Sequence, residues 1–139
     1  MKVHTNVSLS EITYYKIGGK AKYLLDIENS SDLEEALKVI QKNNIKNFLC
    51  LGLGSNIVIP NTEFEGAILH FLTPKIPQIQ QNDQRIKVFA SHHLDDVIEF
   101  GFLHNLIGLE WAGGLPSTVG AAVRGNVGAF GGEIKDNAC

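Results

Sequence analysis

The sequence contains little arginine and no excess of positive charge. Only Arg85 and Arg124 are arginine among its 139 residues, and the formal net charge is −3. A nucleic-acid-binding surface needs clustered Lys and Arg side chains that neutralise phosphates. We therefore expect no nucleic-acid partner, and an anionic small ligand would have to be bound mainly by main-chain N–H groups.

Cysteine and long apolar runs are also scarce. Two cysteines, Cys50 within an apolar run and Cys139 at the last position, are too few for a disulfide framework or a metal-ligand cluster. The sequence has no run of about 18 apolar residues, and residues 1–15 lack the basic and then apolar pattern of a secretory signal. We therefore expect a cytoplasmic protein with no membrane partner and no metal.

The composition is that of an ordinary globular protein, with 44% hydrophobic and 19% charged residues. The first part of the chain predicts a lobe over residues 1–72 in the order β-α-β-β. Ser31 and Glu34 have the spacing of a capping box at the start of a helix that ends near Asn43. The strands are expected at 13–17, 23–25, 48–51, 57–59 and 67–69, and 48–51 has the pattern of a strand buried on both faces, which would make Cys50 a buried thiol.

The remaining residues, 73–139, predict a second, partial lobe. Pro74, Pro77 and the polar run 78–84 indicate an exposed connection, and 86–90 alternates as a half-buried strand does. Ser91 is placed to cap a helix, and we expect the adjacent pair His92–His93 to be solvated or to cap that helix rather than to bind a metal. The inner face of this helix should carry Leu94, Val97, Ile98 and Gly101.

The loop Gly52–Asn56 (GLGSN) directly follows a predicted strand. Alternate glycines let successive main-chain N–H groups face one concavity, which suits a pyrophosphate. The loop is not a Walker motif, because no lysine follows it, and Ile57 stands where the dinucleotide fingerprint needs its third glycine. A tight turn between two strands explains the same residues equally simply.

The segment Gly113–Gly132 is dense in glycine and alanine and contains no acidic residue. Pro116 is placed to begin a short helix with free N-terminal N–H groups and a side of small residues. Such a helix could accept a flat ligand or could simply pack tightly on a neighbour. The run 126–132 predicts extended backbone, and Arg124 has either a surface or a phosphate-positioning role.

Three segments together resemble one known family. Residues 13–21 (TYYKIGGKA), 51–59 (LGLGSNIVI) and 108–136 (GLEWAGGLPSTVGAAVRGNVGAFGGEIKD) are similar in order and spacing to the UDP-N-acetylenolpyruvoylglucosamine reductases. The resemblance runs from about residue 5 to the end of the chain. It implies an α+β fold, the FAD-binding domain of the vanillyl-alcohol-oxidase (PCMH-type) class, with two lobes of which the second is truncated.

The resemblance also implies FAD as the cofactor and assigns the residues that bind it. One loop would receive the pyrophosphate, and the two glycine-rich segments of the second lobe would line the rest of FAD. The implied contacts are Gly52, Leu53, Gly54, Ser55, Asn56, Gly114, Pro116, Ser117, Thr118, Gly120, Ala121, Asn126, Gly128, Ala129, Gly131, Glu133 and Ile134.

The family's reaction implies NADPH as reductant and a nucleotide sugar, UDP-N-acetylglucosamine enolpyruvate, as the substrate reduced for peptidoglycan synthesis. No residue of this chain matches the serine, glutamate and arginine that the family uses in catalysis. We therefore expect an inactive FAD-binding fragment without the substrate domain, whose open second lobe favours self-association. Two alternatives stay open: another FAD-dependent oxidase or dehydrogenase of the superfamily, and a non-catalytic module that packs against a partner.

Overall fold

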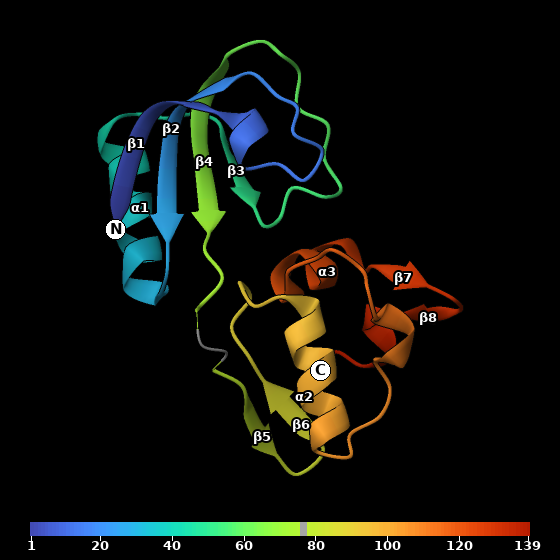
Figure 1. Cartoon of the computed structure of the whole chain (residues 1–139). Coiled ribbons are helices and arrows are strands. Elements are labelled where there is room, and N and C mark those ends of the chain that lie inside the picture. The colour runs from blue at the N-terminus through green and yellow to red at the C-terminus, as the bar shows by residue number, and fades with distance from the viewer. Residues whose placement is uncertain (76–77) are drawn as a thin grey trace. The chain divides into compact units, whose positions relative to one another are not determined.

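The computed structural model describes residues 1–75 and 78–139, so Pro77 of the predicted connection lies outside the described residues. The chain divides into two compact units, Met1–Leu72 and Thr73–Cys139 (Figure 1). Each unit has its own strands, helices and buried apolar core.

The first unit is built on a four-stranded sheet in the order β1-β2-β4-β3. β1 (Lys2–Ser8) is antiparallel to β2 (Lys20–Ile27), whereas β4 (Phe64–Phe71) is parallel to both β2 and β3 (Phe48–Leu51). The helix α1 (Ser30–Lys42) packs against one face of this sheet (Figure 1). The carboxyl ends of three parallel strands therefore lie at one edge.

The helix α1 confirms the sequence prediction, although its cap differs. The side chain of Asn29, not Ser31, accepts a hydrogen bond from the N–H of Asp32 at 3.0 Å. Ala36 and Ile40 are buried against the sheet, as helical spacing requires. Asn44, in the left-handed conformation with φ 49°, follows the end of the helix.

Two separate apolar clusters cover the two faces of the sheet. The helix side contains Leu25, Ile27, Ala36, Ile40, Ala67 and Leu69. The opposite side contains Leu9, Ala21, Leu24, Leu51 and Ile68, with loop residues Ile57 and Ile59 packed on it. These loop residues, with the 3-10 turn Leu9–Glu11, cover a sheet face on which the first unit places no α-helix.

Two of the predicted strands of this unit are absent from the structure, and a third differs in its burial. Residues 13–17 and 57–59 are not strands, and β1 was not predicted. The expectation that 48–51 is buried on both faces is wrong, because β3 is an edge strand that exposes Phe48 and Cys50. Partial burial still raises the pKa of the Cys50 thiol above its ordinary value.

Polar side chains link three strands of the same sheet. Asp26 of β2 lies between two histidines, with its Oδ2 2.8 Å from Nε2 of His4 and its Oδ1 3.2 Å from Nδ1 of His70. His4 belongs to β1 and His70 to β4. One carboxylate therefore bridges both neighbours of its strand.

Among its described residues, the second unit contains two short hairpins and two α-helices. β5 (Gln80–Asn82) pairs with β6 (Arg85–Lys87), and β7 (Gly128–Ala129) pairs with β8 (Gly132–Glu133). The polar run predicted as a connection therefore contains a strand, and the strand predicted at 86–90 is shorter. Helices α2 (Leu94–Leu103) and α3 (Val119–Gly125) and three-residue 3-10 turns complete the unit.

The inner face of α2 confirms the prediction: its buried residues are Leu94, Val97, Ile98 and Gly101. Its N-cap is His93, and Ser91, which was expected to cap it, is buried before the helix. Leu94 and Ile98 pack with Ala112, Ala122 of α3 and Ile134. This core fixes α3 and the chain on either side of it.

Candidate functional site

The loop Gly52–Asn56 extends from β3 at the carboxyl edge of the parallel strands of the first unit. Open sheets with parallel strands bind ligands outside this edge, where main-chain groups are not used by the sheet. The position of the loop therefore fits the sequence prediction of a ligand loop.

Gly54 explains why this loop needs glycine. It has φ 65°, and a Cβ atom there would lie 3.0 Å from Cα of Thr13 and 3.3 Å from its Cγ2. The carbonyl of Gly54 accepts a hydrogen bond from the N–H of Tyr14 at 3.3 Å. The loop therefore rests directly on the turn that follows the first 3-10 turn.

The second motif of this unit, Gly18–Gly19, packs against the residues that follow the loop, from Ile59 to Thr62. The N–H of Gly19 donates to the carbonyl of Pro60 at 2.9 Å, and its own carbonyl accepts from the N–H of Leu9 at 2.8 Å. A Cβ atom at Gly19 would overlap the carbonyl oxygen of Thr62. The hydroxyl of Thr13, which is buried, donates to the carbonyl of Ile17 at 2.8 Å. The fold thus joins the 13–21 and 51–59 motifs.

The loop also has donors that suit an anion. Among the residues that the structure describes, none accepts a hydrogen bond from the main-chain N–H of Leu53, Gly54 or Asn56. Gly54 is nevertheless buried. Leu53 is not among the residues with positive φ, so its bulky side chain causes no backbone strain. Free main-chain donors in a glycine turn fit the pyrophosphate of FAD.

The glycine-rich segment of the second unit is more internally bonded than the sequence predicts. Helix α3 begins at Val119, so Pro116 lies before the helix rather than in its first turn. The N–H of Val119 donates to the carbonyl of His92 at 2.9 Å, and that of Gly120 to the carbonyl of Ala90 at 2.8 Å. The prediction of free N–H groups at this helix start is therefore wrong.

Two further main-chain donors near this helix also have partners. The N–H of Ala121 donates to the hydroxyl of Thr118 at 3.4 Å, and the N–H of Gly114 donates to Oδ1 of Asp95 at 3.0 Å. Thr118 is thus the N-cap of α3, and its side chain is buried. Ligand contacts from this segment would have to come from its exposed outer surface, which includes Pro116 and Ala121.

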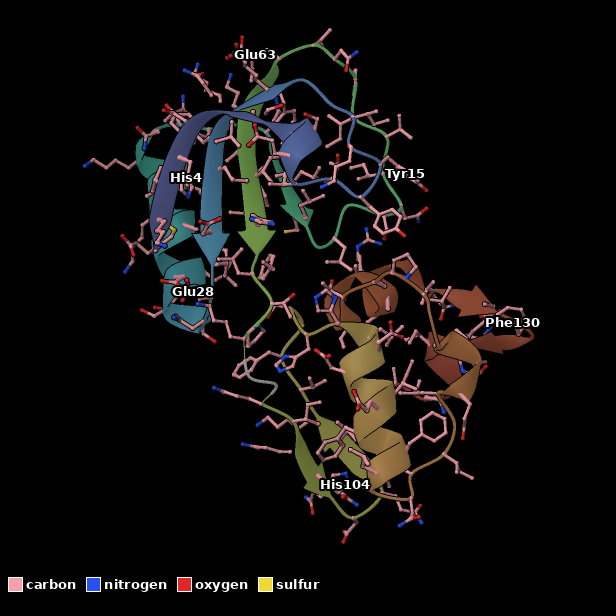
Figure 2. All side chains as sticks on the ribbon, in the orientation of Figure 1. His4, Tyr15, Glu28, Glu63, His104 and Phe130 are labelled. Carbon is pink, nitrogen blue, oxygen red and sulfur yellow. The ribbon has the colours of Figure 1, made fainter. Side chains whose placement is uncertain are left out.

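Residues 126–132 form a hairpin rather than free extended backbone. Gly128 pairs with Glu133 and Ala129 with Gly132. The two turn residues, Phe130 and Gly131, have φ 50° and 88°, as a type I′ turn requires. Figure 2 shows Phe130 at the tip of the hairpin, where it is 91% exposed.

Three polar residues fix the base of this hairpin. Asn126, which ends α3 in the left-handed conformation, donates from Nδ2 to Oε2 of Glu133 at 2.8 Å and accepts the N–H of Lys135 at 2.9 Å. The ammonium of Lys135 lies 2.6 Å from the same carboxylate. The hydrogen bonds from Lys135 and Asn126 lower the pKa of Glu133, and the carboxylate raises that of Lys135.

The structure thus brings the predicted contact residues of the second unit into one continuous stretch around α3. The loop Gly52–Asn56 belongs to the first unit. Ile134 is buried in the core below the hairpin, next to Glu133.

Sequence reasoning missed Thr13 and Asp95 as supports of glycine turns. It also missed His92, which is fully buried rather than solvated. An adjacent His pair carries no signal that distinguishes the buried ring from the exposed one.

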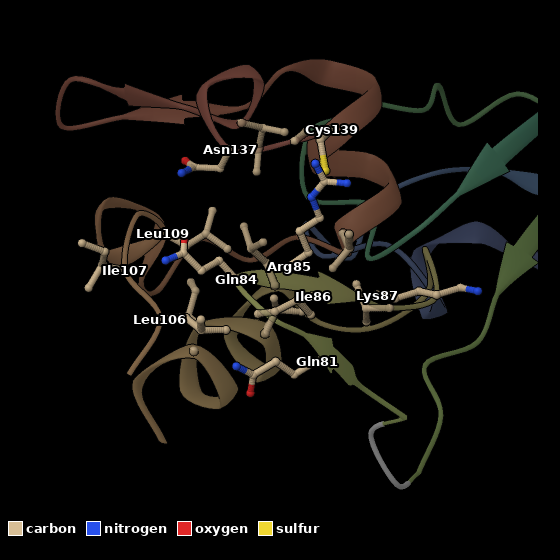
Figure 3. Close-up of a pocket in the computed structure, with 18 of the residues that line it drawn as sticks. Gln81, Gln84, Arg85, Ile86, Lys87, Leu106, Ile107, Leu109, Asn137 and Cys139 are labelled. Carbon is tan, nitrogen blue, oxygen red and sulfur yellow. The ribbon is translucent and has the colours of Figure 1, made fainter. Parts of the chain in front are cut away.

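The second unit also has a cavity of about 700 Å³ (Figure 3). Its wall includes core residues Leu94, Ile98 and Ile134, and its rim carries Arg85 and Ile107. Ile107 is 90% exposed. The core of this unit is therefore open on one side.

No helix in the described part of the chain is long and apolar enough to span a bilayer. Within residues 1–75 and 78–139, no three His, Cys, Asp or Glu side chains are grouped to hold a metal ion.

Comparisons with known proteins agree with the resemblance. The protein from Oceanobacillus iheyensis named UDP-N-acetylenolpyruvoylglucosamine reductase is 33% identical to this chain over 135 residues. These residues make up 94% of this chain and 43% of that protein. The equally named protein of Listeria monocytogenes is 34% identical over 134 residues, or 96% of this chain and 44% of that one. The chain thus spans less than half the length of these relatives.

A solved structure is similar as well. The crystal structure of UDP-N-acetylenolpyruvylglucosamine reductase from Thermus caldophilus matches with a TM-score of 0.77 and 27% identity, covering 98% of this chain and 46% of that one. The family described as FAD binding domain matches residues 21–139. These findings confirm the expected FAD-binding α+β fold, and the chain therefore belongs to the FAD binding domain family.

Proposed function

We propose that the chain binds FAD through both of its units, as the cofactor-binding part of a reductase that acts on an enolpyruvyl nucleotide sugar. The observation that carries the proposal is the loop Gly52–Asn56 at the carboxyl edge of parallel strands: the main-chain N–H groups of Leu53, Gly54 and Asn56 have no acceptor among the described residues, and Gly54 is left-handed. Such a loop suits the pyrophosphate of a dinucleotide.

The proposed contacts are those that the resemblance assigns. The loop of the first unit would bind the pyrophosphate, and the segments 114–121 and 126–134 of the second would bind other portions of FAD. The hairpin ladder and the Asn126–Glu133–Lys135 contacts would hold the second segment rigid before FAD arrives. When bound, FAD supplies the hydride-transfer chemistry.

The reductant, the substrate and the cellular setting are proposed from the relatives. NADPH would be the reductant, UDP-N-acetylglucosamine enolpyruvate the substrate, and peptidoglycan synthesis in the cytoplasm the setting. The chain alone would bind FAD without turnover, because none of its residues matches the family's catalytic serine, glutamate and arginine. An assay of NADPH oxidation with the enolpyruvyl substrate tests this, and robust turnover by the isolated chain would contradict it.

FAD binding is tested by titration of the purified chain, followed through flavin absorbance and fluorescence quenching. Asn56→Asp places a negative charge in the loop and should weaken FAD affinity about tenfold at low salt, because it would repel the pyrophosphate. Asn47→Asp adds the same charge to an exposed position of the first unit outside the loop and should leave affinity unchanged. A chain that remains colourless with excess FAD would favour the non-catalytic module instead.

We further propose that the chain self-associates through the open core of its second unit. The residues that line the cavity include apolar side chains beside polar ones such as Gln84 and Arg85, and the apolar Phe102 and Ile107 among them are 63% and 90% exposed. Apolar surface of this kind favours association in water. Light scattering of the purified chain should report a mass above 15.2 kDa, and a clean monomer would contradict the proposal.

A further inference from the structure

His92 is fully buried in the second unit, and both of its ring nitrogens have partners. Nε2 lies 2.8 Å from the main-chain N of Gln78, and Nδ1 lies 3.2 Å from the carbonyl oxygen of Phe89. An N–H can only donate and a carbonyl can only accept, so Nε2 accepts and Nδ1 carries the proton. The ring is therefore neutral, with one defined tautomer.

The main chain around His92 holds the start of α3. The carbonyls of Ala90 and His92 accept the N–H groups of Gly120 and Val119, and the N–H of Leu94 donates to the carbonyl of Ser117 at 2.9 Å. Residues 90–94 thus form a strip that is hydrogen-bonded along residues 117–120. The direction of these carbonyls depends on the turn that the His92 ring anchors.

We infer that His92 is a positioning residue for FAD: its buried side chain fixes the strip 90–94, and the strip fixes the segment 117–120. This inference rests on the proposed function, because Ser117, Thr118 and Gly120 are among the proposed FAD contacts. The fully buried side chain does not itself touch FAD. It acts only through the main chain.

The test compares the same substitution at two adjacent histidines in the full chain. His92→Leu removes the acceptor of the Gln78 N–H and the donor to Phe89, and should raise the Kd for FAD about tenfold. His93→Leu is the matched control, because His93 is partly exposed and its side chain makes no capping hydrogen bond. His92→Gln, whose amide oxygen can accept from Gln78, should recover most of the affinity.

Two readouts separate positioning from a loss of folded protein. Affinity is measured where circular dichroism shows both Leu variants folded, and amide exchange of Val119 and Gly120 is followed without FAD. His92→Leu should speed that exchange, whereas His93→Leu should not. If His92→Leu does not fold, His92→Met, which also lacks a strong acceptor, replaces it.

The outcomes distinguish the two claims. A wild-type chain that does not bind FAD overturns the proposed function, and the FAD role of His92 with it. A wild-type chain that binds FAD, together with a folded His92 variant of unchanged affinity and unchanged exchange at 119 and 120, overturns the inference alone.

Discussion

Gly120 and Ala90 are in direct contact in the second unit: the N–H of Gly120 lies 2.8 Å from the carbonyl of Ala90, and a Cβ atom on Gly120 would lie 2.7 Å from the Ala90 Cβ. Gly120→Ala should therefore destabilise the chain by about 1–3 kcal/mol through overpacking. Urea unfolding measures the change.

Gly125→Ala is the matched control for that substitution. Gly125 is the last residue of α3, and a Cβ atom there would meet nothing within 4 Å. Alanine should leave the stability unchanged or raise it by up to about 1 kcal/mol, since it restricts the unfolded chain. Equal changes in the free energy of unfolding for Gly120→Ala and Gly125→Ala would contradict the close contact between Gly120 and Ala90.

Phe130→Asn should stabilise the β7–β8 hairpin. Phe130 occupies the left-handed region at φ 50° although it is bulky and almost fully exposed. Asn adopts this conformation readily, so the gain should be about 1 kcal/mol in the free energy of unfolding.

The same variant tests whether this strain serves the ligand. Strained residues that persist in folded proteins are concentrated at functional sites. If the Phe130 ring contacts FAD, Phe130→Asn should weaken FAD affinity while it stabilises the free chain. A variant that is less stable than the wild type would refute the conformational explanation.

Glu133 should make stability depend on pH in the acidic range. Hydrogen bonds from Lys135 and Asn126 hold the pKa of Glu133 below its ordinary value of 4.5. The unfolded chain therefore takes up this proton first, so the stabilisation is complete above pH 4.5 and is lost as the pH falls through the lower folded pKa.

Glu133→Gln tests the direction of this pH dependence of stability. The difference in urea midpoint between wild type and variant should be larger at pH 7 than at pH 3. Glu99→Gln is the matched control, because Glu99 is exposed on α2 and forms no ion pair with a described residue. It should show the same small difference at both values. If the difference in urea midpoint between wild type and Glu133→Gln were larger at pH 3 than at pH 7, the predicted direction would be wrong.

Ile107→Lys should reduce self-association. Ile107 lines the cavity and is 90% exposed, so a lysine there adds charge to the apolar rim without disturbing the core. Leu103→Lys is the control, because Leu103 is 74% exposed on α2 but does not line the cavity. Sedimentation at several concentrations should show a lower mass only for Ile107→Lys, and equal masses would contradict the assignment.

The sequence predicted the elements whose apolar periodicity is strong. The buried faces of α1 and α2 follow from helical spacing, and β4 from the run 67–69. β1 was missed because its side chains are mostly exposed and polar, so they show no alternation. Residues 57–59 look like a strand but are apolar because they cover the sheet from a loop.

The close backbone contacts around the candidate site were predicted to a similar extent. The glycine motifs located the loop at Gly54 and the segment around Gly120, since glycine marks close backbone approach. The hydrogen-bond partners of α3 could not be predicted, because Ala90 and His92 approach it only through tertiary folding. Their carbonyls carry no side-chain signature.

The Asp26 carboxylate has one further consequence for the first unit. Because it contacts His4 and His70 on the two adjacent strands, it can do so only when all three side chains project from the same face of the sheet. A shift of β1 or β4 by a single residue would turn its histidine toward the helix-covered side. The trio therefore selects one strand alignment, which in turn sets where the chain leaves β3 and enters the glycine loop.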